Sequence, residues 1–170
     1  AKDDSRYRPI TLLETIHKMI TGTINRRLLL AIHHGNLLRA GQFGNVIGGG
    51  CATPLRLTVT MYEQARATNK QVHCLYLDFS SAFDTVPHQM LEVAIRSITG
   101  NEKIARWARN MTYGHTRIMT SAYGAADDHT AIELNSGCPQ GDPISPLFYC
   151  IMNEVILRCM QAKHLSLIHI

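Results

Sequence analysis

The stretch "LDFSSAFDTVPH", residues 77–88, places two aspartates six positions apart on either side of a short turn. It follows an apolar run that is too short for a typical helix and that predicts a strand over 72–77. Mg²⁺ prefers oxygen ligands and borrows only one or two carboxylates, so a strand-end aspartate such as Asp78 is a candidate metal ligand. The alternative is a turn former or helix cap, which fits Asp84 better because a helix is expected from Pro87.

The composition is that of a globular protein. Of 170 residues, 45% are hydrophobic and 18% charged, and 17 Lys and Arg against 13 Asp and Glu give a net charge of +4. This mild excess is compatible with a polyanionic partner without demonstrating one. Five scattered cysteines without a CxxC pair indicate free thiols in an intracellular setting rather than disulfides or a zinc site. No apolar run approaches about 18 residues, so we expect no membrane span.

The first third of the chain predicts two helices separated by a glycine-rich loop. Thr11 and Glu14 have the T-x-x-E spacing of a capping box, which predicts a helix start there and a stop at Gly35. The apolar stripe of this helix would consist of Leu12, Ile16, Met19, Ile20, Ile24 and Leu28. A second helix is expected over about 53–68.

The remainder predicts three more helices and a hairpin. Pro87 would open one helix, Asn101 would cap the next, and Ser145 would begin the last. Residues 116–134 predict two strands joined by a turn rich in Gly, Ala and Asp. This order indicates an α+β fold in which helices pack on a small, mainly antiparallel sheet.

Four segments, in the same order, carry a resemblance to one family. "LDFSSAFDTVPH" and "GCPQGDPISPLFY" resemble motifs A and B of the reverse transcriptases of non-LTR (LINE-type) retrotransposons and group II introns. "YRPITLLETIHKMITGTINRRL" is similar to their fingers segment, and "GQFGNVIGGGCATPL" to the loop after it. The resemblance implies the fingers and partial palm of a right-hand polymerase. The implied parts are a fingers-like segment over 1–71, a partial palm over 72–163, and a tail over 164–170 whose native origin is open.

The resemblance implies an RNA-directed DNA polymerase that adds dNTPs to a DNA primer on an RNA template, with Mg²⁺ or Mn²⁺ as cofactor. Asp78 would bind the catalytic metals beside the carbonyl of Phe79, and two cations would stabilise the attacking and leaving oxygens. Phe83 would be a steric gate against a ribose 2′-hydroxyl. Without the motif, Phe83 would be read as a core aromatic.

Further residues are implicated in the same way. Gln140 and Gly141 would lie against the incoming nucleotide, and Arg8 would reach its triphosphate with a guanidinium fork. Outside the motif, "PQG" would be only a surface turn. A groove that follows nucleic-acid phosphates would include Lys18, Arg26 and Arg27, together with Arg39. For Lys18 the alternative is a solvated helix face.

The [FY]xDD sequence of motif C, which the family carries after motif B, is not found after Gln140. Asp127 and Asp128 precede motif B in a Gly- and Ala-rich turn and are better explained as a hairpin turn. We therefore expect a fragment that is inactive alone and prone to aggregate through uncovered strand edges.

A non-catalytic nucleic-acid-binding remnant is the alternative. An RNA-dependent RNA polymerase is disfavoured by Phe83, and a group II intron maturase is a near neighbour. Nuclear action is implied only by the resemblance.

Overall fold

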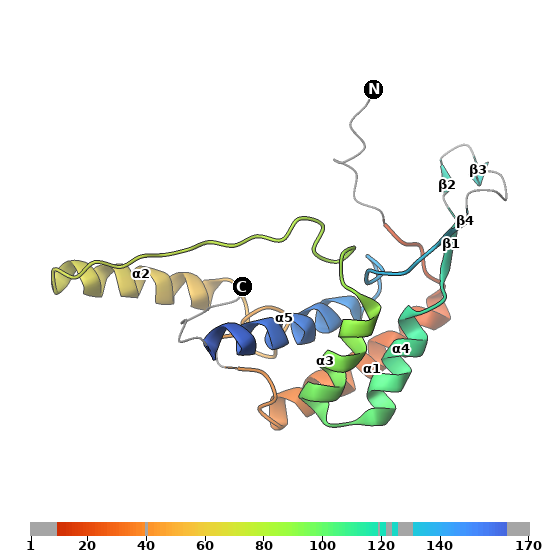
Figure 1. Ribbon diagram of the computed structural model, residues 1–170, viewed down its shortest axis with the longest axis horizontal. Coiled ribbons are helices and arrows are strands. Elements are labelled where there is room, and N and C mark those ends of the chain that lie inside the picture. The colour runs from red at the N-terminus through yellow and green to blue at the C-terminus, as the bar shows by residue number, and fades with distance from the viewer. Residues whose placement is uncertain (1–9, 40, 119, 122–123, 126–130, 163–170) are drawn as a thin grey trace.

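The chain folds into helices and short antiparallel strands, with the strands between the fourth and fifth helices (Figure 1). The structure, a computed structural model, describes residues 10–39, 41–118, 120–121, 124–125 and 131–162. The helices are α1 Thr15–His34, α2 Ala52–Ala67, α3 His88–Thr99, α4 Glu102–Thr112 and α5 Ser145–Gln161. The strands are β1 Thr116–Ile118, β2 Thr120–Ser121, β3 Gly124–Ala125 and β4 Ala131–Glu133. Strand β1 pairs with β4 and β2 with β3, both antiparallel, so the predicted α+β class is confirmed.

The apolar core lies where α3, α4 and α5 meet the C-terminal half of α1. Helix α3 packs against both α4 and α5, and its residues Leu91, Ile95 and Ile98 are buried. Leu28 and Ile32 of α1 belong to the same cluster. No described side chain of strands β1 to β4 belongs to it, so this core is built by helices packing on one another rather than on a sheet.

Local signals account for the α3–α4 hairpin at the lower right of Figure 1. Helix α3 begins after Pro87, as predicted, and ends at Gly100, whose φ of +62° is in the left-handed region that glycine adopts without strain. The side chain of Asn101 accepts hydrogen bonds from the backbone N–H groups of Lys103 (3.0 Å) and Ile104 (3.2 Å). The predicted cap of α4 is thereby confirmed.

The start of α1 differs from the prediction. The helix begins at Thr15 after an N-cap residue, Glu14, that makes no side-chain cap hydrogen bond. The backbone N–H of Thr11 donates instead to the carbonyl of Gln140 at 2.8 Å, so this segment is tied to a distant loop and does not enter the helix. The predicted capping box is therefore wrong. The predicted stop at Gly35 is confirmed, since Gly35 is the C-cap.

The apolar stripe predicted for α1 is buried only toward its C-terminal end. Leu28 is 6% exposed, whereas Leu12 is 85% and Ile16 is 70% exposed. The prediction is wrong for Leu12, which precedes the helix, and no described element packs over Ile16 at its start.

Residues 72–77 do not form the predicted strand. They belong to an extended segment that runs alongside α2 (Figure 1), and the two are linked by the hydroxyl groups of Tyr62 and Tyr76, 3.3 Å apart. A strand exists only through hydrogen bonds to a neighbouring strand, and no described part of the chain offers one here. The strand prediction is therefore wrong for this chain.

The remaining elements lie close to their predicted positions. Helix α2 spans Ala52–Ala67, α5 begins at Ser145, and the hairpin of β1 and β4 falls within 116–134. Asp127, Asp128 and the tail over 164–170 lie outside the described residues. Among the described helices, none combines the length and the apolar character needed to cross a bilayer.

Candidate nucleotide and metal site

Asp78 and Phe79 lie at the end of the extended segment, where it approaches the helical core. Both are exposed, and Phe79 has 51% of its surface accessible. No group of three or more His, Cys, Asp or Glu side chains in the described part of the chain could hold a metal ion. Asp78 therefore supplies an accessible carboxylate, which suits a ligand that Mg²⁺ shares with water and phosphate, but the described residues do not gather the ligands of a complete two-metal site.

A tight turn directs Phe83 inward. The carbonyl of Ser81 (φ +50°) accepts hydrogen bonds from the backbone N–H groups of Asp84 (2.9 Å) and Thr85 (3.1 Å). The ring of Phe83 is half-buried and stacks in a tilted arrangement on Tyr149 of α5, with centroids 5.0 Å apart. Phe83 is thus a supported aromatic wall between the turn and the core.

The turn over 80–87 is joined to the loop over 136–140 by main-chain hydrogen bonds. The N–H of Gly137 donates to the carbonyl of Val86, and the N–H of Cys138 donates to the carbonyl of Phe83, both at 2.8 Å. His88 at the start of α3 is buried and donates from Nε2 to the carbonyl of Gly137 at 2.9 Å. Two segments about fifty residues apart thereby form one surface.

Gln140 contacts a carboxylate that the sequence interpretation treated as structural. Its Nε2 lies 3.2 Å from Oδ1 and 3.1 Å from Oδ2 of Asp84. Asp84 does not cap α3, whose N-cap is Pro87. The carboxylate instead orients the Gln140 amide. In the sequence, the position of Asp84 directly after Phe83 was the signal that could have indicated this contact with Gln140.

Gly141 and Asp142 connect the same loop to α1. Gly141 has φ +113°, and a Cβ there would lie 2.9 Å from the carbonyl oxygen of Thr11. Asp142 is buried, and its Oδ2 lies 2.8 Å from Nε2 of His17. Its Oδ1 accepts a hydrogen bond from the N–H of Ile144 at 3.2 Å. Sequence reasoning had not singled out His17, which fixes this loop from the other side.

Cys138 is part of this loop but is not a nucleophile. Burial, together with the nearby Asp142 carboxylate, raises the pKa of its thiol to about 12. The neutral thiol is therefore the form present near neutral pH.

The predicted basic groove is only partly assembled. Arg26 and Arg27 are exposed on α1, and Lys18 is half-buried. At about 100° per residue, Lys18 and Arg27 lie on opposite sides of the helix, so a single strand cannot follow both on one face. Nε of Arg39 lies 3.6 Å from the buried carboxylate of Glu154. This ion pair engages the Arg39 side chain within the fold rather than with a phosphate. Arg8 lies outside the described residues.

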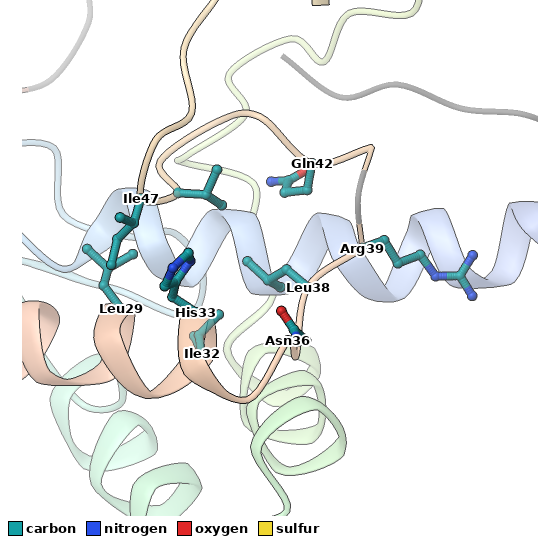
Figure 2. A pocket seen from close by; sticks show the side chains of 9 residues that line it. Leu29, Ile32, His33, Asn36, Leu38, Arg39, Gln42 and Ile47 are labelled. Atoms are coloured by element: carbon teal, nitrogen blue, oxygen red, sulfur yellow. The ribbon is translucent and has the colours of Figure 1, made fainter. Parts of the chain in front are cut away.

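A hollow near the end of α1 is separate from these loops. It has a volume of about 150 Å³ and is lined by Leu29, Ile32, His33, Asn36, Leu38, Arg39, Gln42, Val46 and Ile47. Figure 2 shows Arg39 directed away from the other lining side chains. The hollow is small and mixed in character, and it brings none of the candidate metal or nucleotide residues together.

Comparisons with known proteins agree on one family. A family model described as reverse transcriptase (RNA-dependent DNA polymerase) matches residues 1–170. The chain is 26% identical over 156 residues to the Retrovirus-related Pol polyprotein from type-1 retrotransposable element R2 of Popillia japonica, covering 91% of this chain and 21% of that protein. It is 28% identical over 162 residues to the protein of the same description from Nasonia vitripennis, covering 92% and 15%.

A third relative carries a different description. The chain is 26% identical over 153 residues to the Probable RNA-directed DNA polymerase from transposon X-element of Drosophila melanogaster, covering 90% of this chain and 16% of that protein. The chain therefore spans about a fifth or less of the length of these relatives.

Proposed function

The chain belongs to the reverse transcriptase (RNA-dependent DNA polymerase) family, and on that premise we propose that it is part of an enzyme that adds dNTPs to a DNA 3′-end on an RNA template. The observation that carries the proposal is the junction of the turn over 80–87 with the loop over 136–140. This junction holds Phe83 and Gln140, two residues implicated by the family motifs, on one surface through short hydrogen bonds.

Asp78 and Phe79 have the proposed role of holding a divalent metal ion. The exposed carboxylate of Asp78 is free to bind Mg²⁺ or Mn²⁺, with the carbonyl of Phe79 beside it in sequence. Such an ion, when bound, would neutralise developing charge on transferring phosphate oxygens.

The nucleotide would contact the joined loops. Phe83, supported by Tyr149, is a rigid wall that cannot hydrogen-bond a 2′-hydroxyl, so it favours deoxynucleotides over ribonucleotides. Gln140 is oriented by Asp84, and Gly141 allows the backbone to approach closely. Arg8 would bind the triphosphate.

The nucleic acid would contact basic residues of α1. Arg26 and Arg27 are exposed and available to phosphates, and such contacts give salt-dependent affinity without reading sequence. Lys18, on the side of α1 opposite Arg27, would contact a separate stretch of the nucleic acid. Fingers over 1–71 and a partial palm over 72–163 remain the proposed division of the chain, and nuclear action remains the proposed setting.

A non-catalytic, nucleic-acid-binding remnant is the second candidate. The described residues do not gather the ligands of a two-metal site, a property that this candidate shares with a segment of a longer enzyme. For the same reason, residues 1–170 alone are expected not to polymerise.

Primer extension tests both candidates. Residues 1–170, the complete product of the gene that encodes them, and its Asp78→Ala variant would be assayed on poly(rA)/oligo(dT) with Mg²⁺. We expect extension by the complete product only, with Asp78→Ala reducing it at least about a thousandfold, as for other residues of a site that acts as a unit. A complete product that is folded and binds the duplex without extending it would favour the remnant.

A further inference from the structure

A second hollow lies beside the contact between Asp84 and Gln140. It has a volume of about 350 Å³ and is lined by Asp84, Arg117, Glu133 and the segment 134–137. This volume is at the lower end of the range for small-ligand pockets, roughly 300–1,000 Å³. The hollow is therefore large enough for one unit of a larger ligand. It shares Asp84 and the segment 136–137 with the junction described above, whereas Arg117 and Glu133 take no part in that junction.

Arg117 reaches this hollow from the middle of β1, where it pairs with Ile132 of β4. Its Nη2 is sealed from solvent and has no hydrogen-bond partner among the described residues. Its positive charge also opposes part of the rise in the pKa of Cys138, which follows Gly137 in the chain. A buried donor without an acceptor is unfavourable, so a ligand that supplied an acceptor to this nitrogen would gain affinity.

Two carboxylates share the hollow with Arg117 without neutralising it. Neither Asp84 nor Glu133 forms an ion pair with Arg117 in the described part of the chain. Asp84 is held by the Gln140 amide, and the exposed Glu133 stands on β4 at the rim. The hollow therefore keeps one cationic donor and two anionic acceptors apart, which leaves room for a ligand with both an anionic and a donor group.

The geometry points to a binding site for one ribonucleotide of a single-stranded RNA, with Arg117 binding the phosphate and Glu133 accepting a hydrogen bond from the ribose 2′-hydroxyl. This inference rests on the proposed function, in which the template is RNA. It adds a place where the chain itself would distinguish an RNA strand from a DNA strand.

The mixed lining excludes simpler ligands. A bare phosphate or a triphosphate carries more negative charge than the single charge of a phosphodiester, so the two carboxylates repel it more strongly. A DNA strand would satisfy Arg117 but has no sugar 2′-hydroxyl to donate to Glu133. A ribonucleotide satisfies both, because the guanidinium fork matches phosphate oxygens and the 2′-hydroxyl is a donor that DNA lacks.

Fluorescence anisotropy with the 170-residue chain tests the inference. The probes are a labelled single-stranded RNA of about a dozen nucleotides, DNA of the same sequence, and 2′-O-methyl RNA, each at several salt concentrations. Arg117→Ala is compared with Arg106→Ala, which removes an exposed arginine of α4 that does not line the hollow. Circular dichroism and the fluorescence of Trp107 confirm that each variant is folded.

We expect wild-type chain to bind RNA about five- to tenfold more tightly than DNA or 2′-O-methyl RNA. Arg117→Ala should weaken RNA binding about tenfold and reduce the slope of log affinity against log salt by about 0.7, the value for one phosphate contact on a single strand. Arg106→Ala should change both much less. Glu133→Ala, which removes the acceptor, should weaken RNA binding only, although removing a negative charge would by itself strengthen binding to any nucleic acid.

The inference would be overturned if Arg117→Ala bound RNA with the same affinity and the same salt dependence as the wild type. It would also be overturned if the wild type bound RNA and 2′-O-methyl RNA equally well. Displacement of the RNA by free dNTP would assign the hollow to a nucleotide instead. Primer extension by the complete gene product separates the two proposals. If the complete product extends the primer but the chain shows no preference for RNA over DNA, only this inference is wrong. If the complete product neither extends the primer nor binds nucleic acid, the proposed function is wrong as well.

Discussion

Gly137 is a point of close approach between the two motif-bearing loops, the turn over 80–87 and the loop over 136–140. Its φ is +96°, and a Cβ there would lie 3.0 Å from the carbonyl oxygen and 3.2 Å from the Cα of Asp84. The obstacle is backbone, which cannot rotate away as a long side chain could. A side chain at this position would therefore separate Asp84 from the loop that carries Gln140.

Gly137→Ala should destabilise the chain more than Gly114→Ala. Gly114 also has a left-handed φ, +70°, but a Cβ there would meet nothing within 4 Å. Gly114→Ala is expected to cost about 1 kcal/mol for backbone strain alone, and Gly137→Ala about 2 kcal/mol beyond that for the added clash. Urea unfolding followed by the fluorescence of Trp107 measures both. Equal losses would show that the loops separate without cost.

At single residues, a motif could propose a role, whereas the contacts of those residues could not be predicted. Asp78, Phe83 and Gln140 were singled out from local sequence, and their roles stay predictions. Asp84 binds Gln140 across 56 positions, and His17 binds Asp142 across 125. Neither contact leaves a periodicity or spacing in the chain, because it depends on how the segments meet in space. Tertiary partners of this kind lie beyond single-sequence reasoning.

Elements show the same division between local and distant causes. Helix α3 and the Asn101 cap of α4 were predicted correctly because their signals, an apolar stripe and a cap, act within one turn of helix. The predicted strand over 72–77 and the capping box at Thr11 were wrong because pairing and docking with other segments decide them. The apolar run before Asp78 has the composition of a strand, but no described strand forms hydrogen bonds with it.

Hydrogen exchange should separate the extended segment from the core. We expect the amides of 72–77 to exchange at nearly unprotected rates, because no described strand pairs with them, whereas those of Leu91, Ile95 and Ile98 should be protected by orders of magnitude. Mass spectrometry of the 170-residue chain would resolve the two regions. Protection of 72–77 that grows with protein concentration would instead indicate pairing between copies of the chain.

At the scale of the whole molecule, the cysteines report on burial. Cys51, Cys74 and Cys159 are exposed, whereas Cys138 and Cys150 are buried. Burial is the main cause that raises the pKa of Cys138 to about 12 and of Cys150 to about 11, each from 9.0. A thiol reagent near pH 8 should therefore modify the exposed three rapidly and the buried two only as the chain unfolds.

The same shifts predict how stability depends on pH. The folded state holds these two thiol protons more tightly than the unfolded state, so their contribution is complete below about pH 9 and falls as pH rises toward 11 to 12. Urea unfolding across this range measures the decline. A variant with both cysteines replaced by alanine should start less stable and decline less steeply. An unchanged decline would assign it to other groups.

The position of Asp78 at the junction between the exposed extended segment and the helical core has a practical consequence. Because the cooperative unit is built from α1, α3, α4 and α5, melting temperature reports on the core and is nearly blind to the carboxylate. A substitution at residue 78 would then remove the proposed metal ligand while a thermal-shift screen scores the variant as wild type. Screens for inactivating variants of this chain therefore need a metal- or nucleotide-binding readout alongside thermostability.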